Sequence, residues 1–303
     1  MKIYEYEYGK APPALPPSVL ALGFFDGVHI AHRELIRLAR EEATRLSLPL
    51  YIFTFPIGAD MKRGAPRLTD EKRRLSLFGE LGADGAILCD FASVKKLSAE
   101  VFVKEVLVGA MKAEVAACGY NFRFGSNACA GADELSRLMD AEGKRALIVG
   151  EFALDGVAVS STLIRSYIAE GRMREAERLL GYPFSVTARV GAGKSLGRQL
   201  GYPTVNLSFP EGTVTPRRGV YKSRALIGDR VYPAISNVGS CPTFGERELH
   251  QESFIIGFSG NLYGEEITVE LLEFLRDERR FESAEALKMQ IKIDIERTIK
   301  ENY

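Results

Sequence analysis

Residues 18–32, SVLALGFFDGVHIAH, decide how the first half of the chain is interpreted. A short apolar run, residues 18–22, ends at a glycine and leads through a turn into residues 30–46, where apolar side chains recur at helical spacing. Strand-like and helix-like segments then alternate up to about residue 150. This alternation predicts a parallel sheet with helices on both faces, a fold that binds ligands beyond the carboxyl ends of its strands.

The second half of the chain, after Pro183, has a different rhythm. Strand-like segments follow one another closely and are separated by Gly, Pro, Asn and Asp; they are residues 185–190, 220–227, 231–238, 252–258 and 267–275. Such spacing is typical of an antiparallel barrel or sandwich. A helix from about Ser283 follows the last strand. We therefore expect two domains, residues 1–183 and 184–303.

The composition excludes several classes of protein. The 303 residues fit roughly two domains. Lys+Arg and Asp+Glu both number 40, which argues against a nucleic-acid binder because such proteins need a basic excess. The four cysteines lack C-x-x-C spacing, the N-terminus is polar, and no apolar run is long enough to cross a bilayer. We expect a cytoplasmic protein without a disulfide framework or a membrane partner.

Two of the three histidines, His29 and His32, lie three residues apart at the start of the first predicted helix. Free N–H groups and the helix dipole favour an anion there, so two imidazoles at this position can bind nucleotide phosphates. One alternative is a zinc site, although zinc-binding pairs on helices are usually four residues apart and need further ligands. Another alternative is plain helix capping.

Two other segments are candidates for the same nucleotide site. Ser161, Thr162 and Arg165 stand at the start of a helix-like stretch, where hydroxyls and a guanidinium can bind a polyphosphate. A helix cap followed by a surface arginine is the alternative. Asn121 follows the strand-like residues 115–118 and either contacts a nucleotide or belongs to a packed loop.

Together these segments resemble the adenylyltransferase module of the bifunctional riboflavin kinase/FAD synthetases. The family's G-x-F-D-G-V-H-x-G-H motif matches residues 23–32 except at Ala31, where the family has glycine, and its S-S-T-x-I-R pattern matches residues 160–165. The resemblance implies a Rossmann-like nucleotidyltransferase fold in which the phosphate of FMN attacks the α-phosphorus of ATP and expels pyrophosphate. It implies catalytic roles for His29 and His32. The implied ATP- and phosphate-binding residues are Gly23, Phe25, Asp26, Asn121, Ser161, Thr162 and Arg165.

The second half carries its own candidate site. Thr204 and Asn206 alternate along a strand-like run, so their side chains point the same way and offer oxygen ligands suited to Mg²⁺. A polar strand edge is the alternative. The nearby stretch 191–195, GAGKS, is not a Walker A loop, because Ala188 stands where that loop has glycine and no helix follows. It can still form a glycine-rich phosphate cradle.

The motifs of the second half resemble, in order and spacing, the riboflavin kinase module of the same family. They are residues 193–206, 216–221, 237–244, Glu252, residues 261–264 and residues 275–278. The resemblance implies an antiparallel β-barrel in which Glu252 takes the proton of the riboflavin 5′-hydroxyl during phosphoryl transfer from ATP. It further implies that Thr204 and Asn206 hold Mg²⁺ and that Arg276 contacts the flavin. The implied phosphate contacts are Gly193, Lys194, Gly197 and Arg198.

The sequence therefore predicts a bifunctional enzyme that converts riboflavin to FMN and FMN to FAD, with ATP as co-substrate and Mg²⁺ as cofactor. One alternative is a riboflavin kinase whose first half no longer adenylylates FMN, which Ala31 suggests. Another is a flavin-binding regulator without catalysis, which would have little use for Glu252, Thr204 and Asn206 together. No nucleic-acid partner is expected.

Overall fold

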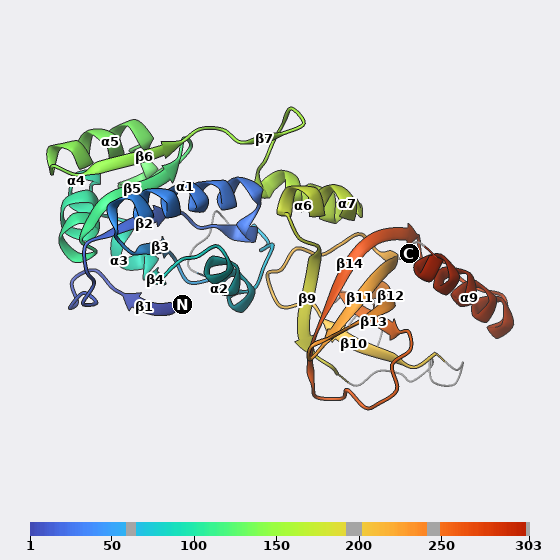
Figure 1. Ribbon diagram of the computed structural model, residues 1–303. Helices are drawn as coiled ribbons and strands as arrows, with labels where there is room; N and C mark the ends of the chain where they lie inside the picture. The colour runs from blue at the N-terminus through green and yellow to red at the C-terminus, as the bar shows by residue number, and fades with distance from the viewer. Residues whose placement is uncertain (59–64, 192–201, 241–248, 301–303) are drawn as a thin grey trace. The chain divides into compact units, whose positions relative to one another are not determined.

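The computed structural model of this protein describes residues 1–58, 65–191, 202–240 and 249–300 (Figure 1). The chain forms two compact units, Met1–Ser161 and Thr162–Tyr303. The helices α6 and α7 are thereby grouped with the second unit, although they precede its first strand in the sequence. Within the described ranges, no helix has the length and apolar character needed to span a membrane.

The first unit is built on a six-stranded sheet whose strands all run parallel. Their order is β1-β4-β3-β2-β5-β6, and their bounds are Lys2–Tyr6 (β1), Ser18–Leu22 (β2), Leu50–Thr54 (β3), Gly85–Cys89 (β4), Ala113–Gly119 (β5) and Arg145–Val149 (β6). The order reverses between β2 and β5, which is where sheets of this kind bind ligands. The predicted parallel α/β fold is confirmed.

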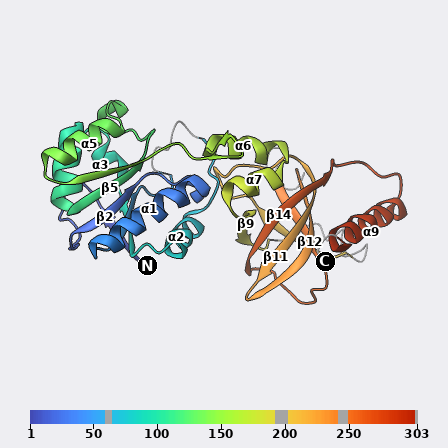
Figure 2. The ribbon, with the colours of Figure 1, turned by 45° about the horizontal axis from the view of Figure 1, so that its top comes forward.

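Helices cover both faces of this sheet, as Figure 2 shows for α1 and α2 on one side and α5 on the other. Their bounds are Ile30–Leu46 (α1), Glu71–Glu80 (α2), Phe91–Val94 (α3), Ala99–Val101 (α4) and Ala132–Ala141 (α5). The other elements are the helical segments Asp26–Val28 (η1), Phe102–Ala110 (η3) and Ser126–Ala128 (η4), and the hairpin strands Ala153–Leu154 (β7) and Val157–Ala158 (β8). Because both faces are covered, β2, β3 and β4 are buried along their whole length.

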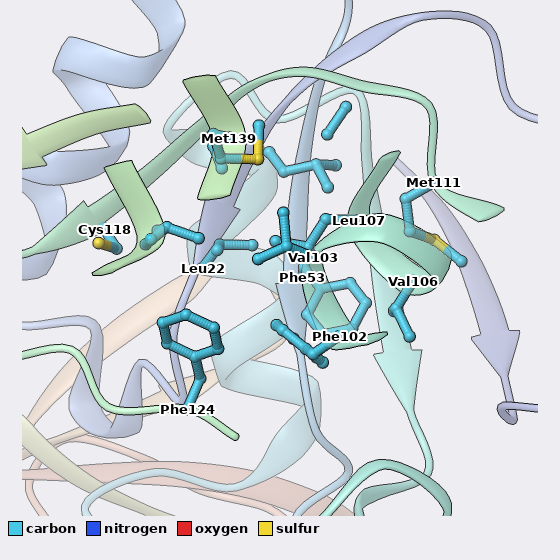
Figure 3. Close-up of a cluster of buried hydrophobic side chains, with 14 of the residues drawn as sticks. Leu22, Phe53, Phe102, Val103, Val106, Leu107, Met111, Cys118, Phe124 and Met139 are labelled. Atoms are coloured by element: carbon cyan, nitrogen blue, oxygen red, sulfur yellow. The ribbon is translucent and has the colours of Figure 1, made fainter. Parts of the chain in front are cut away.

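One core cluster of the first unit lies between the sheet, η3 and α5 (Figure 3). It joins side chains of the strands, such as Leu22 and Phe53, to Phe102 and Met139 from the helices. The rings of Phe53 and Phe102 meet edge to face with centroids 6.0 Å apart. The cluster thus includes residues near the carboxyl ends of β2 and β3.

The second unit contains α6 (Ser161–Glu170), α7 (Met173–Leu180), a six-stranded antiparallel sheet and the C-terminal helix α9 (Ala284–Lys300). The strand order is β10-β13-β12-β11-β14-β9, and the bounds are Phe184–Arg189 (β9), Thr204–Ser208 (β10), Gly219–Ile227 (β11), Arg230–Ser240 (β12), Leu249–Ile255 (β13) and Glu266–Arg276 (β14). The N–H of Gly191 donates to the carbonyl of Asn206 at 2.9 Å, which joins the two outer strands. The sheet thus curls into a barrel, as predicted.

One glycine is required by the pairing of β11 with β14. Gly219 has φ of 146°, and a Cβ built on it would lie 2.5 Å from the carbonyl oxygen of Arg276. The register of the two strands shifts at the neighbouring pair. Any larger residue here would push the two strands apart.

Candidate functional site

The turn between β2 and α1 in the first unit has an uncommon backbone. Phe25, Gly27 and Val28 have φ values of 53°, 79° and 35°. Positive φ costs free energy at the two residues that are not glycine. The turn therefore depends on the groups packed around it. It ends at His29, which is the N-cap of α1.

Four of the predicted site residues lie in this turn or contact it. A Cβ on Gly23 would lie 3.0 Å from the ring of Phe25, so that ring packs closely over the glycine. The buried Asp26 accepts the N–H of Leu68 on Oδ1 at 3.0 Å. The carbonyl of Asp26 accepts the hydroxyl of Ser161 at 3.0 Å. A nucleotide contact by these residues stays a prediction.

The two histidines stack on each other at the start of α1. The ring centroids of His29 and His32 are 3.5 Å apart and the rings are 16° from parallel. The N–H of His32 donates to Nδ1 of His29 at 3.4 Å, so a neutral His29 carries its proton on Nε2. Burial, aided by the neighbouring His29, lowers the pKa of His32 well below its usual value. His32 is therefore neutral at pH 7.

The imidazole of His32 has a buried Nδ1 without a hydrogen-bond partner in the described part of the chain. Among those residues, no group of three or more His, Cys, Asp or Glu side chains is placed to hold a metal ion. Within the described ranges, the zinc alternative therefore lacks the further ligands that it needs. A polar ligand such as a phosphate suits a stacked pair at a helix N-terminus better.

Asn121 lies at the same edge of the sheet as the histidines. It follows β5, which pairs in parallel with β2, so the carboxyl ends of both strands point the same way. The side chain is exposed, and its Oδ1 would lie 3.3 Å from a Cβ on Gly119. The other two predicted phosphate residues, Thr162 and Arg165, belong to the second unit and lie on the first two turns of α6.

The second unit places three polar residues in a row across neighbouring strands. Asn206 on β10 is directly opposite Glu252 on β13, and Glu252 is directly opposite Asn237 on β12. Directly opposite residues share a face of the sheet with Cβ atoms about 5 Å apart. The core residues Leu207 and Ile255 alternate with members of the row, which therefore points away from the interior of the barrel. We call Asn206, Glu252 and Asn237 the cross-strand row.

Thr204 lies on the same face as Asn206, two residues earlier on β10, as the alternation predicts. Its cross-strand neighbour is Phe254, whose ring meets the ring of Tyr202 edge to face at 5.3 Å. The hydroxyl of Thr204 and the amide and carboxylate oxygens of the row are hard donors of the type that Mg²⁺ prefers.

Sequence reasoning assigned no role to Asn237 or Glu278, although both fall in motifs of the second half. Nδ2 of Asn237 donates to Oε1 of Glu278 at 3.0 Å. The carboxylate of Glu278 lies so close to Gly239 that no Cβ fits there. Asn237 donates a hydrogen bond to Glu278, and Gly239 leaves room for the carboxylate. The N-x-G spacing of these two residues was the sequence feature that could have indicated this contact.

Arg276 is engaged in an ion pair within the second unit. Its Nη2 lies 2.8 Å from Oδ2 of Asp294 on α9, and its Nε donates to the same oxygen at 3.1 Å. Asp294 is only 4% exposed. The contact ties α9 to the end of β14, and the predicted flavin contact of Arg276 stays a prediction. The predicted phosphate residues Gly193, Lys194, Gly197 and Arg198 lie outside the described residues.

Sequence reasoning also missed Arg74 on α2. It is buried, and its guanidinium reaches the ends of β2 and β3. Leu77 and Phe78, three and four residues later, share its helical face and are fully buried. A charged residue on the apolar face of a predicted helix could have indicated that Arg74 is buried.

Two family models match the chain: FAD synthetase over residues 11–163 and Riboflavin kinase over residues 180–301. Proteins named bifunctional riboflavin kinase/FMN adenylyltransferase are similar over almost the whole length. The one from Escherichia coli (strain K12) is 34% identical, with 91% of this chain and 90% of that protein covered. The one from Haemophilus influenzae is 32% identical, with 93% of each covered.

Among solved structures, the chain is similar to a crystal structure named Macrolide-efflux Protein from Streptococcus pneumoniae. The TM-score is 0.90 at 31% identity, and all of both chains is covered. That name refers to efflux, whereas both family models and the curated relatives agree on the two flavin activities.

Proposed function

The chain belongs to the bifunctional riboflavin kinase/FMN adenylyltransferase family, and we propose that its two activities reside in the two sites described above. It phosphorylates riboflavin to FMN and adenylylates FMN to FAD, and both steps use ATP. We assign residues 1–183 to the adenylyltransferase domain and residues 184–303 to the kinase domain. A kinase without adenylylation is not favoured, because the FAD synthetase model matches residues 11–163.

In the proposed adenylyltransferase site, a phosphate oxygen of FMN attacks the α-phosphorus of ATP and pyrophosphate leaves. The nucleophile is already an anion, so the protein must supply hydrogen-bond donors to the phosphates and alignment rather than a general base. The stacked pair of His29 and His32 at the N-terminus of α1 carries this proposal. We assign their N–H groups to the ATP phosphates. Asn121, Thr162 and Arg165 remain ligand contacts on the strength of their motifs.

In the proposed kinase site, Glu252 accepts the proton of the riboflavin 5′-hydroxyl as the new bond to phosphorus forms. An alcohol is a poor nucleophile at neutral pH, so a carboxylate within hydrogen-bond reach accelerates the transfer. The position of Glu252 in the middle of the cross-strand row carries this proposal. We assign Arg276 to the flavin, and Gly193, Lys194, Gly197 and Arg198 to the phosphates of ATP.

Thr204 and Asn206 are proposed to hold Mg²⁺. They share one face of β10, and Asn206 is directly opposite Glu252, so the donor set fits a hard cation. When bound, Mg²⁺ neutralises charge on the phosphates of ATP. Removal of divalent cations with EDTA should stop FMN formation, and added Mg²⁺ should restore it.

A cytoplasmic location also remains part of the proposal.

Product analysis of the full chain tests the proposal. The protein is incubated with riboflavin, ATP and Mg²⁺, and flavins are separated by chromatography over time. We expect FMN to appear first and FAD to follow. FMN without FAD would support the kinase-only alternative, and unchanged riboflavin would overturn the kinase assignment. A flavin-binding regulator would retain riboflavin without converting it.

A further inference from the structure

Helix α2 carries a buried cation beside the turn of the adenylyltransferase site. The side chain of Arg74 is 1% exposed. Its Nη1 donates to the carbonyl of Phe24 at 2.8 Å, and its Nη2 donates to the carbonyl of Phe55 at 2.7 Å. Phe24 lies just after β2 and Phe55 just after β3. One guanidinium therefore holds together the carboxyl ends of two neighbouring strands.

Stability alone does not explain an arginine at this position. Taking a guanidinium out of water costs free energy, and an apolar side chain of similar volume is often at least as stabilising. The ion pair with Glu71 is long, with 3.6 Å between Nη2 and Oε2, and Glu71 is partly exposed. Nε of Arg74 has no hydrogen-bond partner in the described ranges. An apolar residue would avoid these costs but could not bind the two carbonyls, so these contacts are what an arginine contributes at this position.

The contact with the carbonyl of Phe24 lies at the start of the turn. The carbonyl of Phe24 immediately precedes Phe25, the first residue with positive φ. The hydroxyl of Thr54 also donates to this carbonyl at 3.2 Å, so two donors hold it. On the other side, the carboxylate of Asp26 is bound by the N–H of Leu68, in the segment that leads into α2. The start of α2 and the segment before it thus fix the turn from two directions.

The guanidinium is a buried positive charge, and in a low-dielectric interior a charge acts on a nearby ion more strongly than it would in water. Glu71 and Asp26 are the carboxylates whose charges oppose the lowering of the Arg74 pKa by burial. The hydrogen bonds, rather than the charge, select arginine over lysine, because a planar guanidinium can serve two carbonyls at once.

We propose that Arg74 is a positioning residue of the adenylyltransferase site: it fixes the ends of β2 and β3 so that the turn presents His29 and His32 to the phosphates of ATP. This inference rests on the proposed adenylyltransferase function. Arg74 acts through the turn and does not contact the reacting atoms.

The test compares Arg74→Met and Arg74→Lys with Leu77→Ala in the full chain. Leu77 is fully buried on the same helix and carries no polar group, so its truncation controls for lost stability. Initial rates of FAD formation from FMN and of FMN formation from riboflavin are measured with the melting temperature of each variant. We expect Arg74→Met to lower kcat of adenylylation about 10- to 100-fold, more than it raises the KM for ATP.

The remaining variants sharpen the result. Arg74→Lys should recover part of kcat, Leu77→Ala should keep kcat at temperatures where it is folded, and the kinase rate should stay unchanged in all three. Wild-type kcat in Arg74→Met overturns the inference, as does an equal loss of kcat in Leu77→Ala. If Arg74→Met does not fold, Arg74→Lys decides, and an unreduced kcat there overturns the inference. If the unaltered chain makes FMN but no FAD, the proposed adenylyltransferase function fails, and the inference fails with it.

Discussion

The two candidate sites are positioned by different physical means. In the first unit, the histidines follow a turn with three positive φ values, which a few buried groups hold in place. In the second unit, the hydrogen-bond register of an antiparallel sheet sets Asn206, Glu252 and Asn237 side by side. The first site, which a turn positions, should lose activity when one of the groups that hold the turn is removed. The second site, which strand pairing positions, should keep its activity after most single substitutions and lose it only when the reacting group or the strand pairing changes.

The largest effect is expected for Glu252→Gln. The amide keeps the shape of the side chain but cannot take the proton, so kinase turnover should fall about 10²- to 10⁴-fold. The KM for ATP should change little, and adenylylation of supplied FMN should be normal. The measurement is the initial rate of FMN formation. Glu265→Gln, an exposed glutamate near the start of β14, is the control. Normal turnover in Glu252→Gln would remove Glu252 from the role of base.

The next largest effect is expected for His29→Ala, which removes one imidazole of the stacked pair. FAD formation from FMN should fall at least about 100-fold, because a preorganised donor to the phosphates is lost. FMN formation from riboflavin should continue at the unaltered rate. Arg37→Ala on the exposed part of α1 is the control. An unchanged FAD yield in His29→Ala would refute the role assigned to the pair.

Gly219→Ala tests how strongly the close pairing of β11 and β14 stabilises the sheet that carries the second site. The added Cβ would lie 2.5 Å from the carbonyl of Arg276, so the free energy of unfolding of the second unit should fall by about 2–4 kcal/mol. Gly228→Ala is the control, because Gly228 also has positive φ but has no atom within 4 Å of the added Cβ. It should cost only about 1 kcal/mol. Calorimetry of both variants measures this, and equal losses would show that backbone strain, rather than the clash, dominates.

The smallest effect is a pH dependence of the first unit. Burial lowers the pKa of His32, so below its ordinary value of about 6.5 the unfolded chain binds a proton that the folded chain does not. The free energy of unfolding should therefore fall as the pH drops from 6.5 toward the folded-state pKa, by less than about 1.4 kcal/mol per pH unit.

His32→Asn should flatten this dependence, because asparagine does not titrate. Calorimetric scans between pH 7.5 and 5.5 measure it, and the transition of the second unit is identified by its shift in Gly219→Ala. If His32→Asn keeps the full pH dependence, another group is responsible.

The sequence predicted the parts of the fold that depend on local pattern. Alternating strands and helices gave the parallel sheet, and the placing of His29 and His32 at the start of α1 followed from the spacing of apolar residues. The alternation of Thr204 and Asn206 placed both on one face of β10. Each of these features repeats within a few residues, so a single sequence carries it.

Contacts between segments that are far apart in the sequence could not be predicted from local patterns. The contacts of Arg74 with the ends of β2 and β3 arise from tertiary packing. The cross-strand row depends on register, which a single strand does not encode.

The start of β13 was also predicted wrongly. The sequence indicated a strand beginning at Glu252, whereas β13 begins at Leu249. The reason is Gln251, which is buried inside the barrel and donates to the hydroxyls of Ser236 and Ser253. A polar residue does not match the apolar pattern that predicts a buried strand position, so the prediction began the strand one residue later.

A complementation assay tests most directly whether the molecule has two separate sites. The variants His29→Ala and Glu252→Gln are each incubated with riboflavin, ATP and Mg²⁺, alone and as an equimolar mixture, and FAD is measured. Neither variant alone should make FAD, and the mixture should make it, because FMN released by one variant is adenylylated by the other. A mixture that makes FMN but no FAD would contradict the account.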